Sequence, residues 1–190
     1  MDQVLISSPP RADFRKSDFS EGNTASATGL VEFVSFAIGD DRYGVDIMAV
    51  REIKEWSSVT HLPNQPDYVR GVLNLRGVVM PIVDLRCRFG QGLTEESPAS
   101  IIIIVQINGR QVGLLADRVL DIVSFEQDKI QPVPRTSEDA ASDFLSGLVT
   151  DDNGMIALID LRNLLEAPTD LMVEDFHSRA IETEQEMSGS

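Results

Sequence analysis

The sequence predicts a mainly β protein built from two copies of one small barrel or sandwich. Three features of the 190-residue chain lead to this prediction: short apolar segments bounded by turns rich in Gly, Asn and Asp, few helical patterns, and a segment that occurs twice. Because 42% of the residues are hydrophobic, the chain can bury a substantial core.

The central part of the chain is predicted to form strands and hairpins. The predicted strands cover residues 33–38, 43–47, 78–85, 101–107, 111–115 and 155–161. Asn108-Gly109 follows the most apolar of these segments and is a strong hairpin signal, because both residues tolerate positive φ. Pro81 interrupts another strand and lacks an N–H group, which favours a position at a sheet edge or a bulge. Residues 90–100 and 131–139 have the Gly, Pro, Ser and Thr content of loops.

A few short helical features are expected between the strands. Single helical turns are predicted before Gly71 and Gly147, since glycine suits the left-handed residue that ends a helix. Asp84 and Asp160 each precede a Leu-Arg pair, where a carboxylate caps the exposed N–H groups of the next turn. Leucines at positions 161, 164 and 165 then predict a short amphipathic helix near the C-terminal end of the domain.

An internal repeat supports the two-unit architecture. Residues 67–86 align without a gap with residues 143–162, a shift of 76 positions. The residues that are identical in both copies occupy the first copy's positions Asp67, Gly71, Asp84, Leu85 and Arg86. A second block aligns residues 44–53 with residues 113–122, a shift of 69 positions. One unit of about seventy residues therefore occurs twice.

The two copies differ most informatively at one turn. Residues 74–77 read Asn-Leu-Arg-Gly, whereas the aligned residues 150–153 read Thr-Asp-Asp-Asn, so Arg76 corresponds to Asp152. A turn that serves only the fold would tolerate either side chain, which makes Arg76 a candidate functional residue. The competing interpretation is an ordinary surface arginine paired with a nearby acid, and from the repeat alone it is the simpler one.

Charge and cysteine content exclude several classes of function. The formal net charge of −15 repels phosphate, so nucleic acid and anionic membranes are poor partners. No basic stripe or aromatic stacking platform points to an oligonucleotide-binding barrel, since Trp56 is the only tryptophan. The single cysteine forbids an internal disulfide, and two histidines cannot complete a Cys/His zinc site. Without a signal peptide or an apolar stretch of spanning length, we expect a soluble cytoplasmic protein.

An enzyme is the alternative from another class, and its sequence support is weak. No phosphate-binding or dinucleotide-binding glycine motif is present. Cys87 has only His61 and His177 as candidate bases, one in a loop and one near the C-terminus. We therefore expect no enzyme activity, no catalytic residue, no cofactor and no metal site.

Both ends of the chain differ from its centre. Residues 1–29 lack apolar periodicity and are predicted to be a disordered arm, while residues 30–165 form the folded domain. Residues 166–190 are predicted to be an acidic tail, of which residues 170–181 can continue as a helix.

These residues resemble the CheW family of bacterial chemotaxis coupling proteins. The resemblance rests on the motif Tyr-Gly-Val-Asp-Ile at 43–47, on Val50-x-Glu52-Ile53, and above all on Asn-Leu-Arg-Gly at 74–77 with Pro-Ile-Val-Asp-Leu-Arg at 81–86. It covers residues 30–165 and implies two intertwined, SH3-like five-stranded barrels. The N-terminal arm and the acidic tail lie outside the shared pattern.

The resemblance also implies function and site residues. CheW-like proteins are adaptors between the cytoplasmic hairpin of methyl-accepting chemoreceptors and the regulatory domain of the chemotaxis histidine kinase, and work in receptor arrays at the inner face of the membrane. Carried over by position, the receptor-binding groove between the barrels would use Val50, Glu52, Arg76, Ile101 and Ile122. An apolar wall would take a receptor helix, and Arg76 would bind a receptor carboxylate through two parallel hydrogen bonds.

Other parts of the function stay open at this stage. The kinase would contact residues 130–136, with Ile130 and Pro132 as the candidate residues. A coupling protein for a chemosensory system that drives pili or another output, or a scaffold that binds only the kinase, fits the same sequence.

Overall fold

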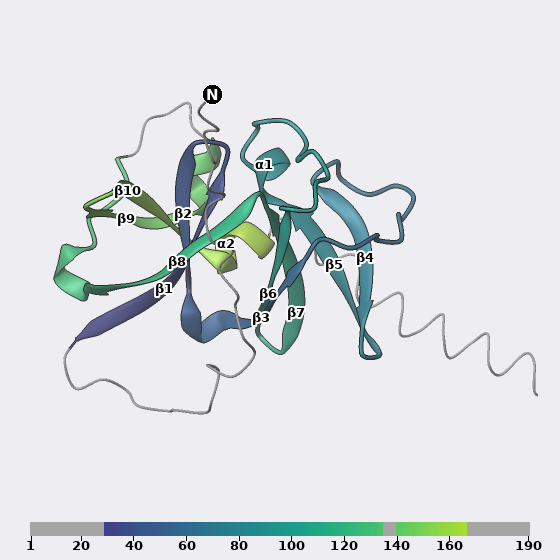
Figure 1. Ribbon diagram of the computed structural model, residues 1–190, viewed down its shortest axis with the longest axis horizontal. Coiled ribbons are helices and arrows are strands. Elements are labelled where there is room, and N and C mark those ends of the chain that lie inside the picture. The colour runs from purple at the N-terminus through teal and green to yellow at the C-terminus, as the bar shows by residue number, and fades with distance from the viewer. Residues whose placement is uncertain (1–28, 135–139, 167–190) are drawn as a thin grey trace, which may run out of the picture.

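Ten strands form two five-stranded sheets in the computed structural model, which describes residues 29–134 and 140–166 (Figure 1). The first barrel has the strand order β8–β1–β2–β10–β9, with the bounds Arg118–Glu126, Leu30–Ile38, Asp41–Asp46, Gly154–Ile159 and Leu145–Asp151. The second barrel has the order β3–β6–β7–β5–β4, with the bounds Val50–Glu55, Ile101–Ile107, Arg110–Ala116, Val78–Asp84 and Val69–Leu75. The helical elements are η1 (Ile47–Ala49), α1 (Leu85–Arg88), η2 (Gln127–Lys129), η3 (Ala140–Phe144) and α2 (Leu161–Glu166).

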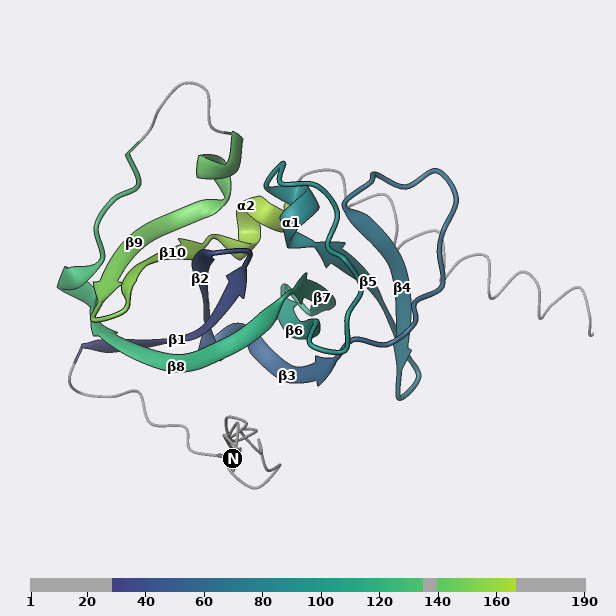
Figure 2. The ribbon, with the colours of Figure 1, turned by 45° about the horizontal axis from the view of Figure 1, so that its top comes forward.

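Each barrel contains strands from both halves of the chain. The first half contributes β1 and β2 to the first barrel and β3, β4 and β5 to the second, whereas the second half contributes β6 and β7 to the second barrel and β8, β9 and β10 to the first. Figure 2 shows the first strand after each crossover, β8 along β1 on one side and β3 beside β6 on the other. The halves are therefore interlocked, and neither barrel is completed by one half alone.

Backbone pairing confirms the repeat found in the sequence. In the first barrel β2 runs parallel to β10 with Gly44 opposite Leu158, and in the second β7 runs parallel to β5 with Gly113 opposite Ile82. These two pairs are related by the same shifts of 69 and 76 positions as the sequence blocks. Both glycines have side chains against their Cα atoms: a Cβ on Gly113 would lie 2.4 Å from Ile82 Cδ1, and one on Gly44 would lie 3.0 Å from Leu158 Cδ2.

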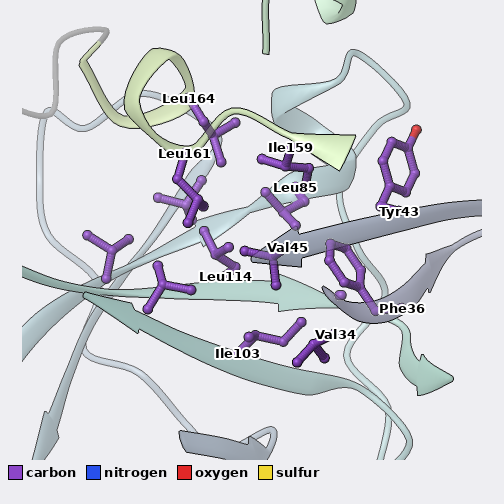
Figure 3. Packing of buried hydrophobic residues seen from close by; sticks show 14 of the residues in the cluster. Val34, Phe36, Tyr43, Val45, Leu85, Ile103, Leu114, Ile159, Leu161 and Leu164 are labelled. Atoms are coloured by element: carbon purple, nitrogen blue, oxygen red, sulfur yellow. The ribbon is translucent and has the colours of Figure 1, made fainter. Parts of the chain in front are cut away.

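The largest apolar cluster lies between the barrels. On β6, Ile102 and Ile104 point into the second barrel, whereas Ile103 and Val105 belong to a cluster shared with β1 and β2 of the first barrel. We call this shared cluster the central core; Figure 3 shows it, with labels on Val34, Phe36, Tyr43, Val45, Leu85, Ile103, Leu114, Ile159, Leu161 and Leu164. Because residues 102–105 of β6 are buried on both faces, this part of the strand is continuously apolar instead of alternating.

A cation between two aromatic rings joins the barrels near α1. The guanidinium carbon of Arg88 lies 4.3 Å from the ring centroid of Tyr68 and 4.3 Å from that of Phe144. Tyr68 and Phe144 occupy equivalent positions of the two copies, since they differ by 76 positions. This cation–π contact stabilises the relative position of the two copies at a point where they meet.

Most predicted elements are confirmed, and the two hairpin strands around Asn108-Gly109 are among them. Asn108 and Gly109 have φ values of 50° and 79°, as a tight hairpin turn requires. Asp84 accepts a hydrogen bond from the Cys87 N–H at the start of α1, and Asp160 does the same for Arg162 and Asn163 in α2. Leu161, however, begins α2 and does not end the last strand.

The sheet edge predicted for Pro81 is wrong, because β5 is an inner strand between β7 and β4. The alternative, a bulge, lies next to Pro81, where the register shifts between the pairs Gly71–Ile82 and Val69–Val83. Proline is tolerated there for two reasons. It pairs with Val72, whose N–H and C=O both bond to Thr60 instead. The parallel ladder with β7 then begins only at Ile82. No strand partner therefore needs the missing N–H group.

The helical turn predicted to end at Gly71 is also wrong. Gly71 lies inside β4, at a register shift against β5, with a φ of 138°. A Cβ there would lie 2.3 Å from the carbonyl oxygen of Thr60, so glycine is required by the close approach of another backbone segment. Before Gly147 the 3-10 helix η3 is present, but it ends at Phe144, and Gly147 lies inside β9 without a positive φ.

The predicted terminal segments lie almost wholly outside the described residues. Of the arm at 1–29 only Gly29 is described, and of the acidic tail at 166–190 only Glu166. Within the described part of the chain, the helices are too short and too polar for any of them to cross a membrane.

Candidate partner-binding surface

The five residues predicted to bind the receptor come from three strands and one turn. Val50 and Glu52 lie on β3, Ile101 begins β6, and Ile122 lies on β8; Arg76 lies in the turn between β4 and β5. Four of the five therefore belong to the second barrel, and Ile122 belongs to the first.

Glu52 and Arg76 form an ion pair. Arg76 Nη1 lies 3.1 Å from Glu52 Oε2, and Arg76 Nη2 donates a hydrogen bond of 3.3 Å to Glu52 Oε1. The pair joins β3 to the β4–β5 turn, although the residues are 24 positions apart. The Arg76 side chain remains 67% exposed and that of Glu52 30% exposed. This contact is what the simpler interpretation predicted, a surface arginine paired with a nearby acid. The exposure of Arg76 nevertheless leaves its guanidinium accessible to a partner protein.

The backbone of Arg76 is in an unusual conformation for its residue type. Arg76 has a φ of 54° and Gly77 a φ of 88°, so the turn has positive φ at both central positions. Asn-Gly and Asp-Gly are the preferred pairs for such a turn, and an arginine at the first position is strained. In the equivalent turn between β9 and β10, neither Asp152 nor Asn153 has positive φ, and Gly154 takes it instead with 117°. The strain at Arg76 therefore points to a use for its side chain.

The three apolar candidates face the space between the barrels. Directly paired residues of antiparallel strands point to the same side of a sheet. Val50 pairs with Val105 and Ile122 pairs with Val34, and both partners belong to the central core. Val50 and Ile101 pack against that core and are partly buried, whereas Ile122 is 39% exposed. They thus lie on sheet faces that turn toward the other barrel, at the margin where the central core reaches solvent.

The equivalent surface of the first barrel has different chemistry. Glu52 corresponds to Asp121 and Arg76 corresponds to Asp152, so an ion pair is replaced by two acids. Ile101 corresponds to Glu32, which accepts a hydrogen bond from Ser124 instead of packing against apolar side chains. The accessible ion pair and the apolar side chain of Ile101 are therefore specific to the second barrel.

The residues predicted to contact the kinase lie on the first barrel. Ile130 packs against the core of that barrel, which is formed by Val149, Ile156 and Leu158. Gln131 exchanges two backbone hydrogen bonds of 2.8 Å with Leu148 at the edge of β9. Pro132 is exposed and lines a hollow together with residues of η3 and β9. Thr136, the end of the predicted segment, lies outside the described residues.

Cys87 has none of the features of a reactive thiol. It lies in α1, partly buried, and burial together with the nearby charge of Asp84 raises the pKa of its thiol. A raised pKa disfavours the thiolate, which is the nucleophilic form. His61 is exposed in a loop, and His177 lies outside the described residues. Among the described residues, no group of His, Cys, Asp and Glu is arranged to hold a metal ion.

A second hollow, which the sequence did not predict, lies between η1, the β6–β7 hairpin and α2. Its lining includes Met48, Asn108 and Arg162, and Met48 is 76% exposed. The signal that could have revealed it is the repeat, because the residue aligned with Met48 is Asp117.

Comparison with known proteins gives the family. The CheW-like domain family matches residues 32–169. The chain belongs to the CheW family. A probable chemotaxis protein CheW of Rhizobium etli is 42% identical over 133 residues, covering 70% of this chain and 86% of the relative. Chemotaxis protein CheW of Klebsiella aerogenes is 35% identical over 144 residues, covering 76% and 87% of the two chains.

A solved structure shows the same fold. The crystal structure of the scaffolding protein TtCheW from Thermoanaerobacter tengcongensis superposes with a TM-score of 0.69 at 32% sequence identity. The match covers 78% of this chain and 96% of that one. The two intertwined barrels are thus the architecture of the family, and the fold predicted from the repeat and the motifs is confirmed.

Proposed function

We propose that this chain is the physical link between the cytoplasmic hairpin of a chemoreceptor and the regulatory domain of the chemotaxis histidine kinase. The observation that carries the proposal is membership of the CheW family, whose model matches residues 32–169. CheW proteins are non-catalytic scaffolds of chemotaxis, and the chain is an adaptor of this kind, not an enzyme. As a bridge to receptors, it would be recruited to receptor arrays at the inner face of the membrane.

The receptor contact is proposed to run along the margin of the central core. Ile122 supplies exposed apolar surface, and Val50 and Ile101 continue it from the second barrel. A helix that docks on such a surface buries its apolar face between the barrels. Arg76, in the β4–β5 turn of the second barrel, would use its remaining donors for a receptor carboxylate while Glu52 holds the guanidinium in place.

The kinase contact is proposed on the first barrel, at the segment that follows β8. Pro132 is exposed beside the hollow bounded by η3 and β9, and Ile130 anchors this segment on the barrel core. Because receptor and kinase surfaces would lie on different parts of the molecule, one copy of the chain can hold both partners at once.

A reconstitution with receptor-containing membranes, purified kinase and the adaptor tests this function. Kinase should sediment with the membranes only when the adaptor is present, and receptor control of kinase autophosphorylation should appear at the same time. Ile122→Asp should weaken the adaptor's sedimentation with receptor membranes, because it places a charge on the apolar surface.

Met155→Asp is the matched control, since Met155 is exposed on β10 and is not part of the proposed surface. If kinase sediments equally well without the adaptor, the bridging function is wrong. If both substitutions weaken sedimentation equally, the bridge stands and the assignment of Ile122 is wrong.

A further inference from the structure

The exchange of strands creates two equivalent corners in the molecule, and only one of them is closed. At the first corner, Asp117 between β7 and β8 accepts hydrogen bonds of 2.6 Å from the Gly39 N–H and 2.6 Å from Arg86 Nη2. The Asp117 N–H also donates to the carbonyl oxygen of Ala37. One carboxylate thus ties the β1–β2 turn to α1, and this arrangement joins the two barrels.

The repeat shows which residues stand at the second corner. By the shifts of 69 and 76 positions, Gly39 corresponds to Asn108, Arg86 to Arg162, and Asp117 to Met48. The equivalence extends to the backbone, because Gly39 and Asn108 both have positive φ, 59° and 50°. The second corner therefore keeps the turn and the arginine but has a methionine where the first corner has the carboxylate.

All three equivalent residues line one open hollow. Met48, Asn108 and Arg162 surround it together with Ala49, Ile107 and Leu161. Within the described part of the chain Arg162 has no acidic partner, and its side chain is exposed. The other two charged groups at the hollow are carboxylates that cap backbone N–H groups: Asp46 accepts from Met48, and Asp160 accepts from Arg162.

We propose that this hollow receives an Asp or Glu side chain of the chemoreceptor hairpin, which takes the place that Asp117 occupies at the closed corner. The inference rests on the proposed function, since it names a second receptor contact. Arg162 supplies the positive charge that a carboxylate needs, and the exposed Met48 adds flexible apolar surface for the neighbouring receptor residue. The hollow also continues the proposed receptor surface, because Met48 and Ala49 lead directly into Val50.

Two substitutions test the proposal from opposite directions. Arg162→Ala removes the cation and should weaken binding of a receptor cytoplasmic hairpin fragment about three- to tenfold, without lowering the melting temperature. Met48→Asp places a carboxylate at the position equivalent to Asp117. The new carboxylate should bind Arg162 as Asp117 binds Arg86, and so occupy the hollow. It should weaken receptor binding at least as much as Arg162→Ala does, with a melting temperature equal to or above that of wild type.

Met48→Asp could weaken receptor binding either by pairing with Arg162 or by repelling the receptor carboxylate. The double variant Met48→Asp/Arg162→Ala distinguishes these two causes. Any gain in melting temperature caused by Met48→Asp should disappear in it, because the partner of the new carboxylate is gone. Met155→Asp is the control for adding a charge at an exposed methionine, and Arg118→Ala is the control for removing an exposed arginine. Both controls should bind the hairpin fragment like wild type.

The binding titration distinguishes the failure of this inference from the failure of the proposed function. If Arg162→Ala and Met48→Asp bind the fragment like wild type while Ile122→Asp binds weakly, the hollow is not a receptor contact and the proposed function stands. If the two substitutions weaken binding of the kinase regulatory domain and not of the receptor fragment, the receptor is the wrong occupant. If wild type does not bind the fragment, both proposals are overturned.

Discussion

The two barrels share one backbone plan but differ in what their equivalent side chains do. In the second barrel Glu52 and Arg76 form an accessible ion pair; in the first, the equivalent Asp121 and Asp152 are two acids. Glycines that pack against neighbouring strands are shared, as Gly44 and Gly113 show. What the copies share therefore serves the fold, and what they do not share is where we place the function.

The largest difference expected on mutation concerns two equivalent aspartates. Asp84 is fully buried and accepts hydrogen bonds from the N–H and hydroxyl groups of Thr94, beside Arg70 at 3.6 Å. Asp160 only caps α2. Asp84→Ala should lower the free energy of unfolding by about 3–5 kcal/mol, because it leaves the buried donors of Thr94 without an acceptor and the Arg70 cation without its partner. Asp160→Ala should lower it by about 1 kcal/mol.

Urea denaturation of both variants measures this difference. Equal losses of unfolding free energy would mean that the loop at residues 90–100, which Thr94 anchors to Asp84, adds nothing to the stability of the second barrel.

A second comparison uses the glycines at the third position of the equivalent strands β4 and β9. An added Cβ at Gly71 would meet the backbone of Thr60 at 2.3 Å, and its φ is positive. At Gly147 the nearest atom is Ile130 Cγ2 at 2.5 Å, on a side chain that can move. Gly71→Ala should therefore cost about 3 kcal/mol and Gly147→Ala about half as much. Thermal unfolding of the two variants measures this difference, and an unchanged melting temperature for Gly71→Ala would contradict the close approach of the Thr60 backbone to Gly71.

An ion pair found only in the first barrel should make part of its stability dependent on pH. Arg42 and Asp151 are joined by hydrogen bonds of 2.6 and 2.7 Å, whereas their equivalents in the second barrel are Gln111 and Leu75. The hydrogen bond from Arg42 holds the pKa of Asp151 below its usual value. Stabilisation from a lowered carboxyl pKa is present above the unfolded-state pKa of about 3.9 and is lost as pH falls through the folded-state value.

Asp151→Asn should accordingly cost about 1 kcal/mol at pH 7, and the difference from wild type should shrink below about pH 4. Asp152→Asn, at the exposed neighbouring position, is the control and should change neither the unfolding free energy at pH 7 nor its dependence on pH. A cost that stays constant from pH 7 down to pH 3 would show that the charge of Asp151 is not the source of its stabilisation.

The smallest expected change in stability is at Arg76, where fold and function are predicted to conflict. Asparagine adopts positive φ more readily than arginine and is preferred before glycine in this turn. Arg76→Asn should therefore raise the unfolding free energy by about 0.5 kcal/mol, even though the ion pair with Glu52 is lost. The same variant should bind a receptor hairpin fragment more weakly. A clear loss of stability would mean that Arg76 is retained for the fold.

The inner strands of both barrels could be predicted from the sequence, and the outer ones could not. Strands β1, β2, β5, β6, β7 and β10 are apolar segments buried against the cores, and each was predicted. Strands β3, β4, β8 and β9 are the edges of the two sheets, and they were missed as strands. Edge strands are partly exposed, as the mixed burial of β8 shows, and their sequences lack a clear apolar pattern.

The candidate site was predictable only in part. Family resemblance named Arg76 and Glu52, but no sequence pattern shows that they touch, since the contact depends on how β3 pairs within the second barrel. The open corner at Met48 could have been predicted by comparing every position of the two copies, which requires both alignment shifts at once. The pairing of Ile122 with Val34, and the fact that Ile122 is exposed whereas Val34 is buried, come only from the structure.

The central claim is that receptor binding depends on the position where the second barrel diverges from the first. The most direct test titrates a chemoreceptor cytoplasmic hairpin fragment into three proteins: wild type, Arg76→Glu, and Asp152→Arg at the equivalent turn. Both substitutions reverse a charge, and Arg76→Glu also removes the partner of Glu52. We predict that Arg76→Glu weakens binding at least tenfold, about 1.4 kcal/mol, while Asp152→Arg binds like wild type. Equal affinities for all three proteins would contradict the claim.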